Sequence, residues 1–203
     1  MIRPGKIVCV GRNYLEHAKE LGNEVPKEPL LFLKPPSSVI GMNESITLPS
    51  QSKQVEYEGE IGIRIGKRIF HATEGEARAA IGGIVAVNDV TARDLQKSDG
   101  QWTRAKGVDT FCPIGPVGIP PDNLDTLTVV TRVNGVERQR GVAADMAFHI
   151  PMLLAYITTI MTLEPGDLVA TGTPAGVGKL AAGDVVEVEV LGLSLISNSV
   201  AAG

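Results

Sequence analysis

Cysteine and aromatic residues are scarce in this chain. Cysteine occurs only as Cys9 and Cys112 among 203 residues, with no CxxC pair and no histidine nearby at ligand spacing. Neither a disulfide framework nor a zinc site is indicated, so we expect two buried thiols in a reducing compartment. Aromatic residues make up 4% of the chain, against 23 glycines and 13 prolines. This composition favours short strands and tight turns over a helical bundle.

The sequence also lacks long basic or apolar runs. It has 23 acidic and 19 basic residues, and no basic run is longer than a pair, which disfavours nucleic acid or an anionic membrane as a partner. No apolar run approaches the about 20 residues of a membrane-spanning helix. Residues 1–6 lead into a short strand instead of a signal-peptide core. We expect a cytoplasmic protein whose residues 1–203 form a single domain with its own core.

Glu58 and Glu60 are the most informative pair. They lie two residues apart in a predicted strand that continues to Ile65, so both carboxylates project from one face and repel each other. A hard divalent cation between them would remove this repulsion, and Asp89, which closes an apolar strand, is a candidate third oxygen ligand. Such a set selects Mg²⁺, Mn²⁺ or Ca²⁺ over zinc. Spacing alone leaves two matters open: Glu56 shares the face, and a solvated acidic face explains the pair equally well.

Periodicity and turn signals divide the rest of the chain into short elements. Thr73 and Glu76 can form a capping box for a helix at 73–80, and Asn134-Gly135 suits the type I′ turn of a hairpin. Residues 91–113 show no clear period, and we predict an ordered irregular segment there. The other predicted elements are strands at 6–10, 30–33, 39–40, 84–87, 127–133, 136–139, 168–170 and, last, 184–190, and helices at 13–21 and 145–161. In the last helix, Pro151 marks either a kink or the true first turn.

Candidate acid–base residues lie on the predicted first helix. His17 and Glu20 are three residues apart, so the carboxylate can orient the imidazole and raise its basicity toward water. An exposed helical ion pair is the alternative interpretation of this spacing.

Further candidates could bind an anionic substrate. Lys106 can offset negative charge, and Arg93 can hold a carboxylate by bidentate contacts; a solvated lysine and a structural arginine are the alternatives. The loop at 171–179 departs from GxxxxGK[ST], so it predicts no nucleotide site. Its main-chain amides and the Thr173 hydroxyl could bind a small carboxylate.

Several segments together resemble the fumarylacetoacetate hydrolase superfamily. The resemblance is greatest to its short acylpyruvase, oxaloacetate decarboxylase and 2-hydroxyhepta-2,4-diene-1,7-dioate isomerase members. The segments occur in the family's order over nearly the whole chain: VGRNY at 10–14 followed by His17, LKP at 33–35, EGEIG at 58–62, NDVTARD at 88–94, AK at 105–106, FCPIGP at 111–116 and TGTP at 171–174.

The resemblance implies a β-rich α+β fold, a mixed β-sheet roll with peripheral helices, and a homodimer without the separate N-terminal domain of larger members. It also implies Mg²⁺ or Mn²⁺ as the cofactor. By matching motif positions, the roles would be as follows: metal ligands Glu58, Glu60 and Asp89, without Glu56; Lys106 facing the substrate; Arg12, Arg93 and Thr173 at its carboxylate end; and His17 with Glu20 as a water-activating dyad on a lid at about 12–25.

The resemblance further implies a small 2-oxo or 2-hydroxydienoic acid as substrate. The metal would stabilise an enolate formed from it. We predict hydrolysis of a carbon–carbon bond in a 3-acylpyruvate, because His17 and Glu20 have the spacing of a water-activating dyad. Isomerisation of a 2-hydroxyhepta-2,4-diene-1,7-dioate and decarboxylation of oxaloacetate are the alternatives. A noncatalytic binding protein stabilised by its metal is the alternative of another class.

Overall fold

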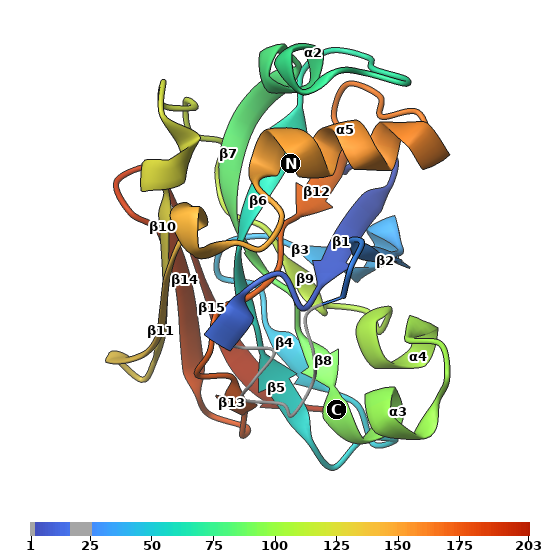
Figure 1. The fold of residues 1–203 in the computed structure, drawn as a ribbon. Coiled ribbons are helices and arrows are strands. Elements are labelled where there is room, and N and C mark those ends of the chain that lie inside the picture. Colours follow the sequence, from blue (N-terminus) through green and yellow to red (C-terminus); the bar gives the residue numbers. More distant parts are fainter. Residues whose placement is uncertain (1–2, 17–25) are drawn as a thin grey trace.

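Two five-stranded sheets form most of the molecule in the computed structural model, which describes residues 3–16 and 26–203 (Figure 1). The first sheet has the order β2 (Leu30–Lys34), β1 (Ile7–Gly11), β12 (Leu168–Ala170), β6 (Gly59–Ile65) and β7 (Ile81–Asn88). The second has the order β11 (Val136–Val142), β10 (Thr128–Val133), β14 (Val185–Val190), β15 (Ser194–Ala202) and β4 (Ile46–Leu48). Each sheet is antiparallel except for one parallel pair, β1 with β12 and β15 with β4.

Smaller elements complete the fold. A three-stranded sheet has the order β13 (Gly178–Lys179), β5 (Val55–Tyr57) and β8 (Thr91–Ala92), and β3 (Val39–Ile40) pairs in parallel with β9 (Cys112–Pro113). The α-helices are α2 (Glu74–Ala79), α3 (Arg93–Ser98), α4 (Thr103–Lys106) and α5 (Ile150–Ile160). The 3₁₀ turns are η1 (Pro36–Ser38), η2 (Leu124–Thr126) and η3 (Ala143–Asp145). In the described part of the chain, no helix is long and apolar enough to cross a membrane.

The largest core cluster lies where β6 and β7 pack against β10, β14 and β15. Alternate residues of β6, Ile61, Ile63 and Ile65, enter this core, whereas Glu60 and Gly62 occupy the intervening positions. Glycine is required at position 62, because an added Cβ would lie 2.5 Å from Val87 Cγ2. Alternation along β6 therefore separates the apolar core from the Glu60 carboxylate on the other face.

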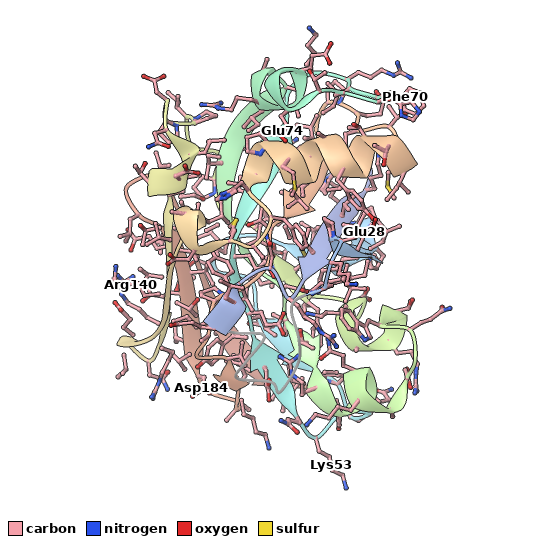
Figure 2. All side chains as sticks on the ribbon, in the orientation of Figure 1. Glu28, Lys53, Phe70, Glu74, Arg140 and Asp184 are labelled. Carbon is pink, nitrogen blue, oxygen red and sulfur yellow. The ribbon has the colours of Figure 1, made fainter. Side chains whose placement is uncertain are left out.

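The helices lie in two groups (Figure 1). Helices α2 and α5 pack together at one end of the molecule, and α3 and α4 lie at the other, next to β5 and β8. Charged side chains such as Lys53 and Arg140 project away from the ribbon, as Figure 2 shows. By contrast, Glu58, Glu60, Asp89 and Lys106 are buried.

The β-rich fold and several predicted elements are confirmed. Helix α2 has the full capping box of Thr73 and Glu76, and Asn134 and Gly135 both have positive φ between β10 and β11. Strand β12 has the predicted bounds. These elements depend on local signals, which a single sequence contains.

Four predicted elements were wrong in part. The long helix begins at Ile150, not at residue 145, and Pro151 lies in its first turn, which was one of the two predicted alternatives for this proline. The irregular segment at 91–113 contains α3 and α4. Strand β14 is followed by β15, so residues 184–190 are not the last strand. Glu58 lies in a break between β5 and β6, not within one continuous strand.

Candidate active site

A cavity of about 280 Å³ opens where strands of the first sheet end beside α3 and α4. Glu60 comes from β6, Glu58 from the break before it, and Asp89 from the residue after β7. Pairing of Gly59 with Asn88, and a bond of 2.8 Å from the Asp89 amide to the Glu58 carbonyl, join these positions. The full lining is Val10, Gly11, Arg12, Phe32, Glu58, Glu60, Asp89, Arg93, Gln96, Lys97, Trp102, Lys106 and Thr173.

Three buried carboxylates converge at this cavity. Glu58, Glu60 and Asp89 each offer one oxygen, and these atoms lie within 4.8 Å of one another. All three residues are at most 5% exposed. Glu58, in the break before β6, and Glu60, within β6, lie together as predicted, and the residue after β7 adds Asp89. The three residues expected to act as ligands are therefore adjacent.

Each carboxylate is bonded to a protein donor. Lys34 Nζ donates to Asp89 Oδ1 at 2.6 Å. Arg93 donates to Glu58 Oε1, and the Gly172 amide donates to Glu60 Oε2 at 2.8 Å. Gly172 has φ +101°, and an added Cβ would lie 2.8 Å from the Cβ of Asn13, so glycine is required there. These three donors restrict the rotation of the carboxylates.

Lys106 lies between two of the carboxylates. Its Nζ donates to Glu58 Oε2 at 2.7 Å and to Asp89 Oδ2 at 2.6 Å, and it lies 5.0 Å from the centre of the Phe32 ring. Burial alone would lower its pKa, but Asp89 and Glu58 outweigh burial and raise the pKa above the ordinary lysine value. Lys106 is therefore an ammonium group at physiological pH.

The pKa of Glu60 reflects the concentration of negative charge at the site. Burial and the neighbouring Asp89 and Glu58 carboxylates raise its pKa well above the ordinary glutamate value, against the opposing effects of Lys106 and the Gly172 amide. A divalent cation among the three residues would stabilise their ionised forms. The set contains only oxygen donors, which suits Mg²⁺ or Mn²⁺. The residues present thus fit such an ion.

Glu56 lies apart from the three ligand candidates. It accepts a bond of 2.7 Å from Arg93 Nε and one of 2.6 Å from Gln54. Arg93 also donates to Gln96 and Glu58, so its guanidinium bridges two carboxylates of the protein. Arg93 lines the cavity, but its predicted role toward a substrate carboxylate stays a prediction. The observed bonds of Arg93 fit the alternative interpretation, that of a structural arginine.

Thr173 also lines the cavity and is bonded to the protein. Its hydroxyl donates to the Gly59 carbonyl at 2.8 Å and accepts from Gln139 Nε2 at 2.8 Å. Gln139 in turn accepts from the Gly59 amide at 3.0 Å. Thr173 and Gln139 together therefore fix the main chain between the two glutamates. Binding of a substrate carboxylate by Thr173 stays a prediction.

The outer wall of the cavity combines aromatic and cationic side chains. The rings of Phe32 and Trp102 meet edge to face with centroids 5.2 Å apart. Arg12, which has φ 59°, and Lys97 line the same cavity. Such a wall suits a small anion that has an unsaturated or apolar segment.

His17 and Glu20 lie outside the described residues, so the dyad and most of the lid at 12–25 stay predictions.

Sequence reasoning missed Lys34 and Gln139. Lys34 follows the apolar residues 30–33 and precedes Pro35, and a charged residue at the end of an apolar strand was the same signal that identified Asp89. Gln139 offered no local signal.

The chain belongs to the fumarylacetoacetate hydrolase family. The fumarylacetoacetate (FAA) hydrolase C-terminal family matches residues 6–201. The resemblance predicted from the sequence motifs is confirmed, and so is the fold class.

Three similar proteins illustrate the family. Oxaloacetate tautomerase FAHD1, mitochondrial, of Arabidopsis thaliana is 46% identical over 199 residues, which are 93% of this chain and 87% of that protein. The structure of 5-carboxymethyl-2-hydroxymuconate delta-isomerase from Mycobacterium smegmatis has a TM-score of 0.92 and 41% identity, and the match covers 100% of this chain and 80% of that one. Fumarylpyruvate hydrolase from Pseudomonas aeruginosa, in complex with Mn²⁺ and pyruvate, has a TM-score of 0.90 and 31% identity, with coverage of 98% and 91%. All three are enzymes.

Proposed function

We propose that this protein is an enzyme that uses a divalent cation to form the enolate of a small 2-oxo acid, and that it interconverts the keto and enol forms of oxaloacetate. One observation supports the proposal most: three buried carboxylates within 4.8 Å of one another lie beside the Lys106 ammonium group in a cavity. A site that only stabilised the fold would need the carboxylates alone.

Glu58, Glu60 and Asp89 would hold Mg²⁺ or Mn²⁺, which supplies Lewis-acid polarisation of a neighbouring carbonyl when bound. Negative charge develops on the substrate's C2 oxygen when a base takes a proton from C3, and His17, oriented by Glu20 in the predicted dyad, would be that base. The Lys106 ammonium group, which is buried between Glu58 and Asp89, would stabilise that charge. Phe32 and Trp102 would exclude water from one side of the substrate, and Arg12 would bind a carboxylate of the substrate.

We favour proton transfer over bond cleavage because the more similar relatives are named as enzymes that rearrange their substrates. The names tautomerase and isomerase denote rearrangements that release no fragment, and they belong to relatives at 46% and 41% identity. The relative named as a hydrolase is 31% identical. Both reactions pass through an enolate, and the described part of the site contains the residues that would stabilise it. Hydrolysis additionally requires an activated water molecule.

The test follows the ultraviolet absorbance of enol-oxaloacetate as it converts to the keto form. With Mg²⁺ or Mn²⁺ the protein should accelerate this decay strongly, and with a chelator it should not. Lys53→Met, a change at the surface, is the matched control for Lys106→Met, which should abolish most of the acceleration. Equal rates with cation and with chelator would contradict the proposal.

Hydrolysis of a 3-acylpyruvate is the second candidate. The spacing of His17 and Glu20 favours it, and so does the similarity to fumarylpyruvate hydrolase. Its test is the release of pyruvate from acetylpyruvate, measured with lactate dehydrogenase, for the wild type and His17→Ala. Release that is unaffected by His17→Ala would remove the dyad from the mechanism.

The same coupled assay with oxaloacetate tests decarboxylation, which forms pyruvate, whereas tautomerisation forms none. Loss of absorbance from a 2-hydroxydienedioate without pyruvate release would identify isomerisation. A protein that binds Mn²⁺ but turns over none of these acids would be the noncatalytic alternative.

A further inference from the structure

Lys34 is one of the most deeply buried charged residues in the described chain. It ends β2 and is 1% exposed. Its Nζ donates to Asp89 Oδ1 at 2.6 Å and to the Val90 carbonyl at 3.2 Å. Lys34 does not line the cavity, so neither a substrate nor a cation there would touch it. Burial of an ammonium group is costly unless it is paired, and its partner is a candidate metal ligand.

The two oxygens of Asp89 have different partners. Oδ1 accepts from Lys34, whereas Oδ2 accepts from Lys106, the ammonium group that also bonds Glu58. Lys34 and Lys106 therefore bond different oxygens of the same carboxylate. The Val90 carbonyl fixes the position of the ammonium group relative to the main chain at the end of β7. Rotation of the Asp89 carboxylate would break this arrangement.

We propose that Lys34 is a positioning residue for the divalent cation: by holding Oδ1, it presents Oδ2 of Asp89 as the single ligand atom. Arg93 and the Gly172 amide hold one oxygen of Glu58 and one of Glu60 in the same way. Lys34 thus completes a set of three donors, one behind each ligand. This inference rests on the proposed function, because it assumes that the three carboxylates bind a cation.

Charge and orientation make opposite predictions for the loss of Lys34. Removal of a positive charge near the site makes it more negative, so charge alone predicts tighter cation binding. Loss of the bond to Oδ1 frees Asp89 to rotate and predicts weaker binding. Loss of the partner of a metal ligand typically costs about 10- to 100-fold in affinity. The sign of the change therefore distinguishes positioning from electrostatics.

The experiment measures Mn²⁺ binding by the electron paramagnetic resonance signal of free Mn²⁺, with no substrate present. Lys34→Met should weaken binding about 10- to 100-fold. Lys6→Met is the matched control because it breaks another lysine–aspartate pair, Lys6 with Asp167, which directly precede β1 and β12 and do not line the cavity. It should change the affinity by less than about twofold.

Unchanged or tighter binding by Lys34→Met would overturn the positioning role, whereas no binding by the wild type would refute the proposed cation site itself.

A second measurement covers the case in which Lys34→Met does not fold. In Asp89→Asn/Lys34→Met neither charge of this pair remains, whereas Asp89→Asn alone leaves the Lys34 ammonium group buried with uncharged acceptors only. If Lys34 acts through Asp89, the two variants should bind Mn²⁺ within about threefold of each other. A tenfold or larger loss on adding Lys34→Met would show that Lys34 acts by another route.

Discussion

Substitution of Gly59 by alanine would press on the main chain between Glu58 and Glu60. A Cβ at Gly59 would lie 1.9 Å from Thr131 Oγ1 and 3.2 Å from Val188 Cγ1. Ordinary van der Waals contact begins near 3.4 Å, so the chain or Thr131 must move by roughly 1.5 Å. The Gly59 amide and carbonyl are bonded to Gln139 and Thr173, which restrict the movement.

We expect Gly59→Ala to lower the free energy of unfolding by about 2 kcal/mol, within the usual cost of inserting one carbon into a packed interior. The displaced carboxylates should also lose Mn²⁺ affinity by about tenfold, which corresponds to about 1.4 kcal/mol. Urea unfolding and Mn²⁺ titration measure the two effects. Both follow from one steric contact.

Thr131→Ala provides the matched rescue. The Thr131 hydroxyl is buried and has no hydrogen-bond partner among the described residues, so its removal breaks no bond seen there. The Gly59→Ala/Thr131→Ala variant should recover at least half of both losses. Wild-type stability and Mn²⁺ affinity in Gly59→Ala, or no recovery in the double variant, would refute the steric argument.

Three further predictions concern other residues. Burial raises the pKa of Cys9 well above its ordinary value and that of Cys112 to about 12, so neither thiol should react with a disulfide reagent at pH 8 until urea unfolds the chain; rapid labelling of the native protein would contradict this. Lys106→Met should retain Mn²⁺ binding but lower the turnover number for oxaloacetate about 100-fold or more, and turnover at the wild-type rate would exclude the role of Lys106 in charge stabilisation. Thr73→Ala removes the N-cap of α2 and should cost about 1 kcal/mol in urea unfolding; an unchanged midpoint would show that α2 does not depend on this cap.

Local sequence signals predicted the shared face of Glu58 and Glu60 but left the role of Glu56 open. Parity places all three glutamates on one side of a strand. The observed difference arises from pairing partners: β6 pairs with β7, which brings Asp89, whereas Glu56 in β5 pairs with Thr91 of β8 and bonds Arg93. Such pairings join residues far apart in the sequence, so they were available only through the family resemblance.

Helices α3 and α4 were missed because they are short, with six and four residues. Helices of this length are not stable by themselves and form through tertiary packing, so they show little periodicity.

Strand β15 was missed for a different reason. Two of its inward positions are the buried Ser194 and Asn198, which bond main-chain atoms of neighbouring segments. Polar residues at these positions interrupt the apolar alternation that predicts a strand.

The central claim is that Glu58, Glu60 and Asp89 hold one divalent cation. Titration of the protein with Mn²⁺, followed by the free-ion resonance signal, tests it most directly when the wild type is compared with Glu60→Gln and with Glu56→Gln. We predict one Mn²⁺ per chain, a loss of affinity of at least about tenfold in Glu60→Gln, and a smaller loss in Glu56→Gln. Absence of binding by the wild type, or equal affinity in Glu60→Gln, would contradict the claim.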